Sequence, residues 1–228
     1  MFNFIHEFLN EAIYVVPAVL ISLSLHELAH AYTAYKLGDY TQKERGRITL
    51  NPFKHLDPMG TICLIFLKFG WAKPVQVDPY YFKDRKQGMI WTSLAGPMVN
   101  LILGFLCVFG FYGLQKLLFT TSLAQIIFSS SVMSEIVHYL ITLLSYTAVI
   151  SIGLGLFNLI PIPPLDGSKL LLGILHEDTY FKVMQYEQVL GGVLVLLLVF
   201  GVLDGPLLYA REAMINCFTQ VSTMILGM

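Results

Sequence analysis

The chain has 228 residues, of which 56% are hydrophobic and 13% are charged, and its formal net charge is -1. This composition excludes an ordinary soluble domain and indicates an integral membrane protein that lies in the lipid bilayer. The near-neutral charge gives no reason to expect nucleic acid as a partner.

Apolar stretches long enough to cross a hydrocarbon core of about 30 Å recur along the chain. We predict membrane spans at about 12–37, 88–115, 134–158 and 186–203. A last stretch, 206–227, is apolar but has charged residues near its start, so it either spans the membrane or lies along its interface. The expected fold class is an all-α polytopic membrane protein, a bundle of about four to six transmembrane helices in a single domain, 1–228.

The segment between the first two predicted spans, 38–87, carries most of the lysines and arginines. In contrast, residues 1–11 have none and 116–133 have only Lys116. Because cytoplasmic loops are enriched in these residues, we expect a multi-pass protein of the cell membrane with 38–87 in the cytoplasm and the N-terminus outside.

Two parts of this segment, "GRITLNP" and "FGWAKPVQVDP", have β-branched residues punctuated by glycine and proline, a pattern typical of short strands and turns. The apolar run between them, "MGTICLIFLKF", is too short to span comfortably. We therefore predict a small β-strand and re-entrant region after the first helix.

The first predicted span contains the motif "HELAH", in which His26 and His30 are four residues apart and Glu27 follows the first histidine. On a helix, this spacing lets both imidazoles face one metal ion, and the glutamate is placed to act as a base. Polar groups inside a membrane helix are costly unless they have a function. The motif predicts a zinc site of the hydrolytic type.

Catalytic zinc usually has three protein ligands, and the best third candidate is Asp166 in "NLIPIPPLDGSKLL". The prolines before it prevent a continuous helix and favour an unwound segment that lines a cavity. Alternatively, Asp166 caps a short helix. Weaker carboxylate candidates are Asp57, Asp78, Asp84, Glu177 and Asp178. His55, in "NPFKHLDPMG", is more typical of a turn than of a metal ligand.

Three motifs together resemble the site-2 protease family of intramembrane zinc metalloproteases: "HELAH" on a membrane helix, "AGPMVN" from Ala95 to Asn100, and "NLIPIPPLDG" from Asn158 to Gly167. The motifs occur in that family's order, and the resemblance covers roughly 12–175. "NPFKHLDPMG" and "FGWAKPVQV" resemble the short family members without a PDZ or CBS domain.

The resemblance implies one Zn²⁺ per chain held by His26, His30 and Asp166, with Glu27 as general base. It also implies a catalytic core of about 12–175, with C-terminal helices at about 180–228, and a transmembrane protein or peptide as substrate. Asn158 would hold the polarised carbonyl or the peptide, or alternatively cap a helix end.

Gly96, Pro97 and Asn100 would let helices approach closely and order the site. The alternative function is a non-proteolytic membrane metal-binding or zinc-transport protein.

Overall fold

The computed structural model describes residues 2–57, 60, 73–120 and 123–228, and in this part of the chain the architecture is helical. Three helices are long: α1 (Phe2–Lys36), α4 (Arg85–Thr120) and α6 (Ser131–Asn158). Two more, α9 (Glu187–Val199) and α10 (Asp204–Leu226), follow towards the C-terminus. The short elements are α2 (Thr41–Glu44), η1 (Pro52–Lys54), η2 (Pro79–Tyr81), α5 (Leu123–Phe128), η3 (Asp166–Leu170), α7 (Leu171–Ile174) and α8 (Glu177–Met184).

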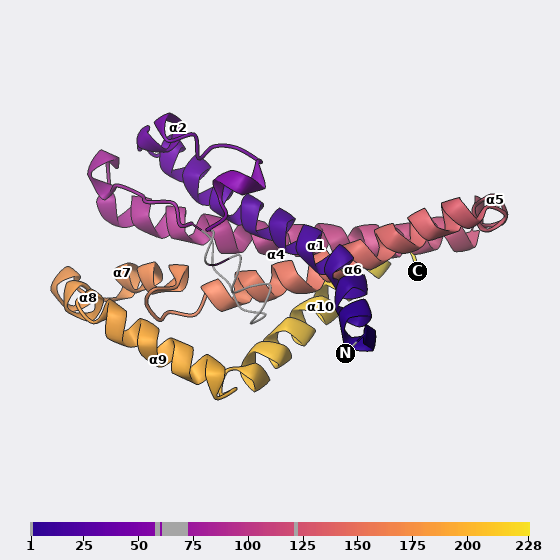
Figure 1. Ribbon diagram of the computed structural model, residues 1–228. Helices are drawn as coiled ribbons and strands as arrows, with labels where there is room; N and C mark the ends of the chain where they lie inside the picture. Colours follow the sequence, from indigo (N-terminus) through magenta and orange to yellow (C-terminus); the bar gives the residue numbers. More distant parts are fainter. Residues whose placement is uncertain (1, 58–59, 61–72, 121–122) are drawn as a thin grey trace.

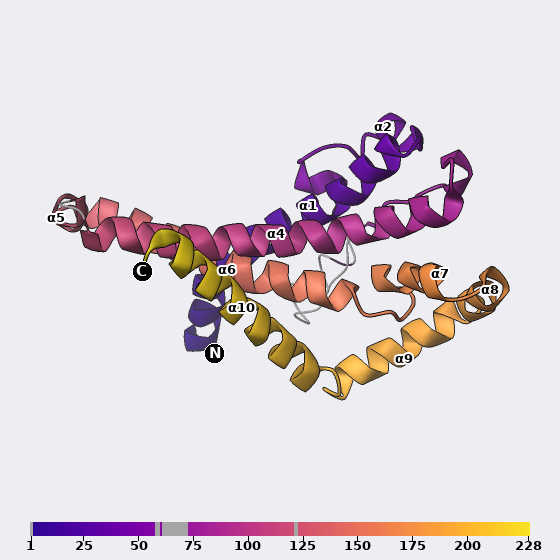
Figure 2. The same ribbon diagram turned by 180° about the vertical axis from the view of Figure 1, so that it is seen from behind.

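The centre of the molecule is formed by α1, α4 and α6, which pack against one another (Figure 1). The most extensive contact is between α4 and α6, where a glycine removes a side chain from the interface. A Cβ atom at Gly104 of α4 would lie 2.4 Å from Cγ1 of Ile152 on α6. Farther along the chain, α10 returns to pack against both helices (Figure 2).

Fewer helices of the described residues are long and apolar enough to cross a membrane than the sequence led us to expect. Within the described residues, three helical stretches are long and apolar enough to cross a membrane, Asn10–Lys36, Arg85–Thr120 and Ser131–Asn158. A fourth is possible only if the bent pair Asp178–Met184 and Glu187–Val199, at 60°, counts as one span. The prediction of four to six spans is therefore not confirmed, and α10 does not meet the criterion.

The predicted strands are not confirmed either. Residues 46–51 and 73–78 form no strand, and the run 59–69 lies outside the described residues except for Gly60. The physical reason lies in the backbone of 73–78. The N–H of Lys73 donates to the main-chain carbonyl of His55, but other polar groups of this segment bond to side chains instead of to a neighbouring strand. The N–H of Val75 donates to Glu27 at 3.0 Å, and the carbonyl of Gln76 accepts from Gln42 at 2.8 Å. Pro74 has no N–H to offer.

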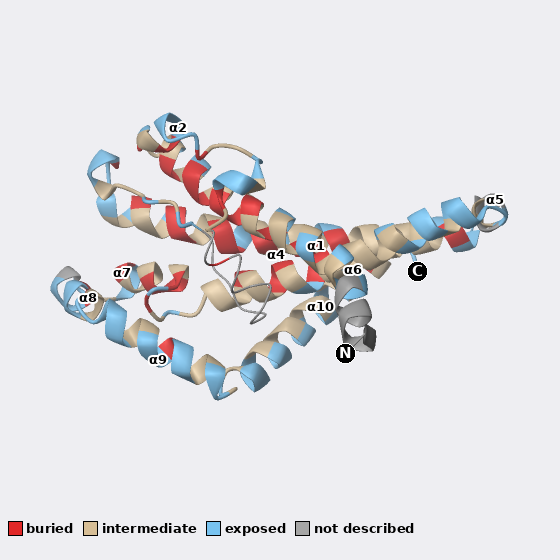
Figure 3. Ribbon diagram, in the orientation of Figure 1, coloured by how far each residue is buried: buried red, intermediate tan, exposed pale blue. Residues whose placement is uncertain are grey.

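Buried residues concentrate where α1 crosses α4 and near the loop before α7 (Figure 3). The outer surfaces of the long helices expose large apolar side chains, among them Ile13, Ile102 and Leu140. Large exposed apolar surfaces are unusual for a soluble protein and suit contact with lipid. The polar interior at the helix crossing is therefore the place to look for a functional site.

Candidate metal centre

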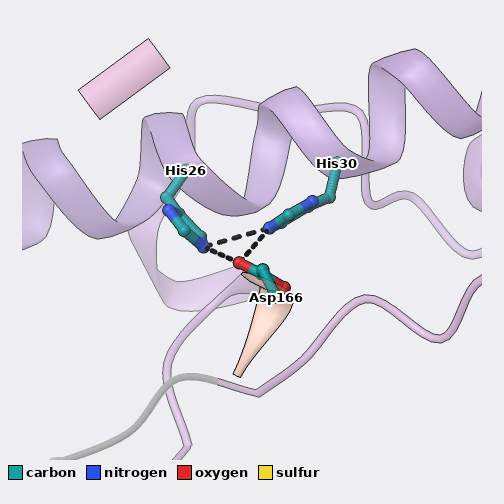
Figure 4. Close-up of side chains that lie close together, drawn as sticks. All are labelled: His26, His30 and Asp166. Carbon is teal, nitrogen blue, oxygen red and sulfur yellow. Dashed lines mark hydrogen bonds and ion pairs between the residues drawn. The ribbon is translucent and has the colours of Figure 1, made fainter. Parts of the chain in front are cut away.

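The helix α1 presents His26 and His30 on the same face, one turn apart, as the four-residue spacing dictates. Both side chains are buried, at 5% and 7% exposure. Their Nε2 atoms lie 3.0 Å apart and point to a common position (Figure 4). The arrangement of the two imidazoles agrees with the geometry predicted from the motif.

Asp166 is the first residue of η3 and lies close to the two histidines, although it is 140 and 136 residues away from them in the sequence. Its Oδ2 atom lies 3.1 Å from Nε2 of His26 and 3.1 Å from Nε2 of His30 (Figure 4). The turn that carries it is tight, because a Cβ at Gly167 would lie 2.3 Å from the carbonyl oxygen of Leu159. No side chain caps the start of η3, so the capping alternative for Asp166 does not describe this structure.

The donor set fits a zinc ion. Two imidazole nitrogens and one carboxylate oxygen converge with separations of 3.0 to 3.1 Å, near the roughly 3.3 Å expected around an ion with bond lengths of about 2.0 to 2.2 Å. In addition, Gly96 of α4 leaves the space beside them open, since a Cβ there would lie 2.3 Å from Nε2 of His30. Three ligands with the fourth position open is the pattern of a catalytic zinc site.

The orientation of His30 is fixed by α4. Its Nδ1 atom lies 2.7 Å from the carbonyl oxygen of Thr92, which can only accept a hydrogen bond. The proton of the neutral ring therefore sits on Nδ1, and Nε2 keeps its lone pair for a metal. A hydrogen bond of this kind on the second nitrogen is typical of histidines that bind metal.

Glu27 lies beside the two histidines and is buried, at 7% exposure. It borders a cavity of about 510 Å³ that the three candidate ligands also line. Its Oε2 atom accepts a hydrogen bond from the N–H of Val75 at 3.0 Å, which holds the carboxylate at the cavity wall. The other lining residues are Pro74, Val75, Val77, Met89, Thr92, Ser93, Asn158, Pro164 and Lys169.

The remaining sequence candidates lie in different surroundings. Asn158, the last residue of α6, lines the cavity, and its Nδ2 donates to the carbonyl of Leu154 at 3.0 Å. His55 follows η1 and is fully buried, with Nε2 2.8 Å from the carbonyl oxygen of Thr49. Among the described residues, the group able to hold a metal consists of His26, His30 and Asp166 alone. His55 is therefore part of the turn, as its sequence context indicated.

The sequence did not reveal two contributions to the site, the N–H of Val75 and the carbonyl of Thr92. Both are main-chain groups: every residue has a carbonyl, and every residue except proline has an N–H. No residue pattern therefore marks them. Gly96, by contrast, was visible as a small residue at a helix contact, and the structure shows that the contact is with the imidazoles themselves.

Comparisons with known proteins show the family to which the chain is related. The model of peptidase family M50 matches residues 14–201. The protein named "Putative zinc metalloprotease YwhC" of Bacillus subtilis is 37% identical over 220 residues, which cover 91% of this chain and 92% of that protein. No solved structure gives a significant match.

More distant relatives are longer proteins. "Putative zinc metalloprotease Rip2" of Mycolicibacterium smegmatis is 34% identical over 73% of this chain and 59% of its own length. "Zinc metalloprotease MJ0392" of Methanocaldococcus jannaschii is 27% identical over 82% of this chain and 42% of its own length. The residues that the family model matches, 14–201, include His26, His30 and Asp166.

Proposed function

We propose a specific reaction for this chain, which belongs to peptidase family M50 and is a zinc metalloprotease: hydrolysis of peptide bonds in or near the transmembrane segments of other membrane proteins. The observation that carries the proposal is the convergence of His26, His30 and Asp166 beside Glu27 at one cavity. Two of these ligands sit on a helix that is long and apolar enough to span a membrane.

Each residue has a role in this reaction. His26, His30 and Asp166 hold one zinc ion, which when bound polarises the scissile carbonyl and lowers the pKa of water. Glu27 takes a proton from the water that attacks the carbonyl carbon. As the carbon–nitrogen bond breaks, Glu27 returns the proton to the leaving amine. Asn158, at the cavity wall, is placed to contact the peptide or its carbonyl oxygen.

The substrate follows from the location of the site. A transmembrane helix has its backbone hydrogen-bonded internally, and it must unwind before a water molecule can attack. The cavity is bordered by Pro74, Val75 and Val77, which belong to the positively charged segment 38–87. We propose that this segment is cytoplasmic, that the N-terminus is outside, and that water reaches the cavity from the cytoplasm.

This orientation has its own test. Single cysteines placed in 43–57 should be protected from a membrane-impermeant reagent added outside intact cells, and cysteines placed in 123–130 should react. The opposite labelling pattern would overturn the orientation without affecting the zinc chemistry.

A non-proteolytic metal-binding or zinc-transport protein is the alternative. A transporter is expected to offer ligands along a pathway through the membrane. In the part of the chain that the structure describes, one group of potential ligands is present, and Glu27 lies beside it bonded to Val75 instead of joining it. That arrangement favours hydrolysis, because only hydrolysis needs a base next to the ligands.

The decisive experiment measures zinc content and cleavage together. Glu27→Gln keeps the size of the side chain and an oxygen that can accept from Val75, so bound zinc should remain near one per chain. Cleavage of a co-expressed single-span membrane protein should fall by on the order of a hundredfold to ten-thousandfold. His26→Ala and Asp166→Ala should lose zinc, and His138→Ala, an exposed histidine on α6, should lose neither property.

Two results would contradict the proposal. Full zinc occupancy in His26→Ala or Asp166→Ala would refute the ligand set. A Glu27→Gln protein that cleaves at the parental rate would refute the role of Glu27 and bring the metal-carrier alternative forward.

A further inference from the structure

The imidazole of His26 has different surroundings at its two nitrogens. Nε2 faces His30 and Asp166, whereas Nδ1 lies 3.1 Å from the amide nitrogen of Asn100 on α4. Asn100 is fully buried. An amide NH₂ can only donate, so in this orientation the neutral imidazole accepts at Nδ1 and carries its single proton on Nε2. That tautomer has no lone pair at Nε2 for a metal.

The other end of the same amide is unsatisfied. The Oδ1 atom of Asn100 is buried and has no hydrogen-bond partner. A half turn of the amide about its Cβ–Cγ bond exchanges oxygen and nitrogen within nearly the same volume. In that second orientation, Oδ1 accepts a hydrogen bond from Nδ1–H of His26. With the proton on Nδ1, the Nε2 atom keeps a free lone pair, which is directed at Asp166 and His30.

We propose that Asn100 is a positioning residue that holds His26 in its metal-binding tautomer by accepting a hydrogen bond through Oδ1. The two orientations of one amide thus correspond to a tautomer that binds metal and a tautomer that does not, and zinc selects the first. The inference rests on the ligand set given under Proposed function. It assigns to Asn100 a chemical role beyond helix packing.

A comparison with His30 supports this role. The Nδ1 atom of His30 faces the carbonyl of Thr92, a main-chain acceptor that cannot turn over. Both candidate ligands on α1 therefore have a group of α4 at Nδ1, but only the group at His26 can present either a donor or an acceptor. Hydrogen bonds to the second nitrogen of a metal-binding histidine fix its tautomer and typically change metal affinity by about 10-fold to 100-fold when removed.

Contacts with α6 hold the backbone of Asn100 in place, whereas no hydrogen bond holds its amide oxygen. Ser151 of α6, also fully buried, donates its hydroxyl to the main-chain oxygen of Asn100 at 2.9 Å. On the same side, a Cβ at Gly155 would lie 3.3 Å from Cβ of Asn100, so α6 packs closely against this turn of α4. The distance between Asn100 and His26 is thus set by helix packing and not by the hydrogen bond of the Asn100 amide.

The test is the zinc affinity of purified protein, measured by competition with a chelator. Asn100→Leu keeps the size but removes the acceptor, and it should weaken zinc binding by about 10-fold to 100-fold. Asn100→Asp keeps an acceptor for Nδ1–H and should bind zinc within a few-fold of the parent. Ser151→Ala is the matched control, because it removes a buried bond to the same residue but leaves the amide, and its affinity should stay near that of the parent.

Either of two affinities would overturn the inference. Parental affinity in Asn100→Leu would show that the acceptor is not needed, and an equal loss in Asn100→Asp and Asn100→Leu would show that only packing matters. A parent protein that holds no zinc, or a His26→Ala protein that holds a full complement, would instead refute the proposed ligand set. The two kinds of failure are therefore distinguishable.

A second measurement needs no substitution at Asn100. Nitrogen NMR of zinc-loaded protein with ¹⁵N-labelled histidine reports which ring nitrogen carries the proton, and the signal of His26 is assigned from its absence in His26→Asn. The inference requires a protonated Nδ1 in the parent. A proton on Nε2 of His26 in the zinc-loaded protein would overturn it, even if every Asn100 variant failed to fold.

Discussion

The cavity has two sides that are built in different ways. On the helical side, α1 and α4 cross so closely that Gly96 lies directly against the imidazoles of His26 and His30. On the loop side, residues 38–57 and 73–84 have no strands, and side chains that bond to the main chain hold them together. Close helix packing thus helps to place the two candidate metal ligands on α1, whereas polar anchors place the segment whose Val75 N–H holds Glu27.

Two residues provide most of these anchors. The guanidinium of Arg47, which is 7% exposed, donates to the carbonyl oxygens of Lys54, Lys73 and Pro74. The carboxylate of Asp39, which is fully buried, accepts from Thr41, Gln42 and the N–H of Asp78. Each anchor connects parts of the chain separated by the 61–72 run. Substitutions on the helical side should therefore cause loss of bound metal. Substitutions on the loop side should cause loss of local order in the loop.

The largest effect is expected from Gly96→Ala on the helical side. The added methyl group would lie 2.3 Å from Nε2 of His30 and 2.8 Å from Nε2 of His26, where it occupies the space next to the ligand atoms. We expect loss of most bound zinc and of cleavage, measured by metal analysis and by the co-expression assay. The mechanism is overpacking, which typically costs about 1 to 3 kcal/mol even without a metal site.

The matched control for this substitution is on the same helix. At Gly113 of α4, nothing lies within 4 Å of an added Cβ, and alanine is favoured over glycine in a helix by about 1 kcal/mol. Gly113→Ala should therefore keep zinc and activity. Normal zinc content in Gly96→Ala would show that the helical side is not held by close packing.

The same contrast explains how much could be predicted from the sequence. The three long helices follow from apolar length, and the convergence of His26 and His30 follows from their spacing on one helix. Asp166, distant in the sequence, was found because unwound backbone marked by prolines inside a membrane protein must line a cavity or be buried. Each of these inferences depends on local pattern or on the constraint imposed by lipid.

The backbone conformation of the loop side could not be predicted from the sequence, for a physical reason. The β-branched residues Val75 and Val77 suggested a strand, but a strand also needs a neighbour to bond with, and here the main-chain groups bond to Glu27, Arg47 and Asp39 instead. Such bonds join residues up to 48 positions apart. Propensity describes the residue and not its distant partner, so the loop geometry could not be derived from the sequence.

A second, smaller effect is expected from Arg47→Gln on the loop side. The substitution removes a buried charge that donates to three carbonyls, and hydrogen bonds to charged groups contribute about 1.5 to 3 kcal/mol each. We expect zinc content to stay near one per chain. Two of the three bonds reach Lys73 and Pro74, so hydrogen exchange in peptides covering 73–80 should accelerate by about a hundredfold or more.

Arg45→Gln serves as the control for that experiment. Arg45 makes one exposed contact with the same segment, to the carbonyl of Gln76 at 3.3 Å, and surface interactions of this kind contribute little. Exchange in 73–80 should then change only slightly. If Arg47→Gln instead lost its zinc, metal binding on the helical side would depend on the order of the loop side, and the two sides of the cavity would not be independent.

The smallest effect is expected from Asp39→Asn. Its second oxygen becomes an amide nitrogen, so either the N–H of Asp78 or the Thr41 donors face another donor. Losing one or two such bonds costs about 1 to 2 kcal/mol, and exchange in 73–80 should accelerate about 5-fold to 30-fold at neutral pH. Asp84→Asn is the control, since Asp84 accepts from Gln87 at the start of α4 and makes no contact with 73–78 among the described bonds.

The pH dependence of this difference sharpens the test. Burial raises the pKa of Asp39, but the hydrogen bonds from Asp78, Thr41 and Gln42 outweigh it and hold the pKa below its ordinary value. Because the pKa of Asp39 is lowered in the folded protein, its carboxylate stabilises the loop at any pH above the ordinary pKa of about 3.9. This contribution is lost as the pH falls through the lower pKa of the folded protein. The protonated carboxyl resembles the amide of Asp39→Asn. In zinc-free protein, the difference in exchange between the parent and Asp39→Asn should therefore be constant near neutral pH and shrink below about pH 4. A difference that persisted unchanged at lower pH would mean that the charge of Asp39 does not anchor the loop.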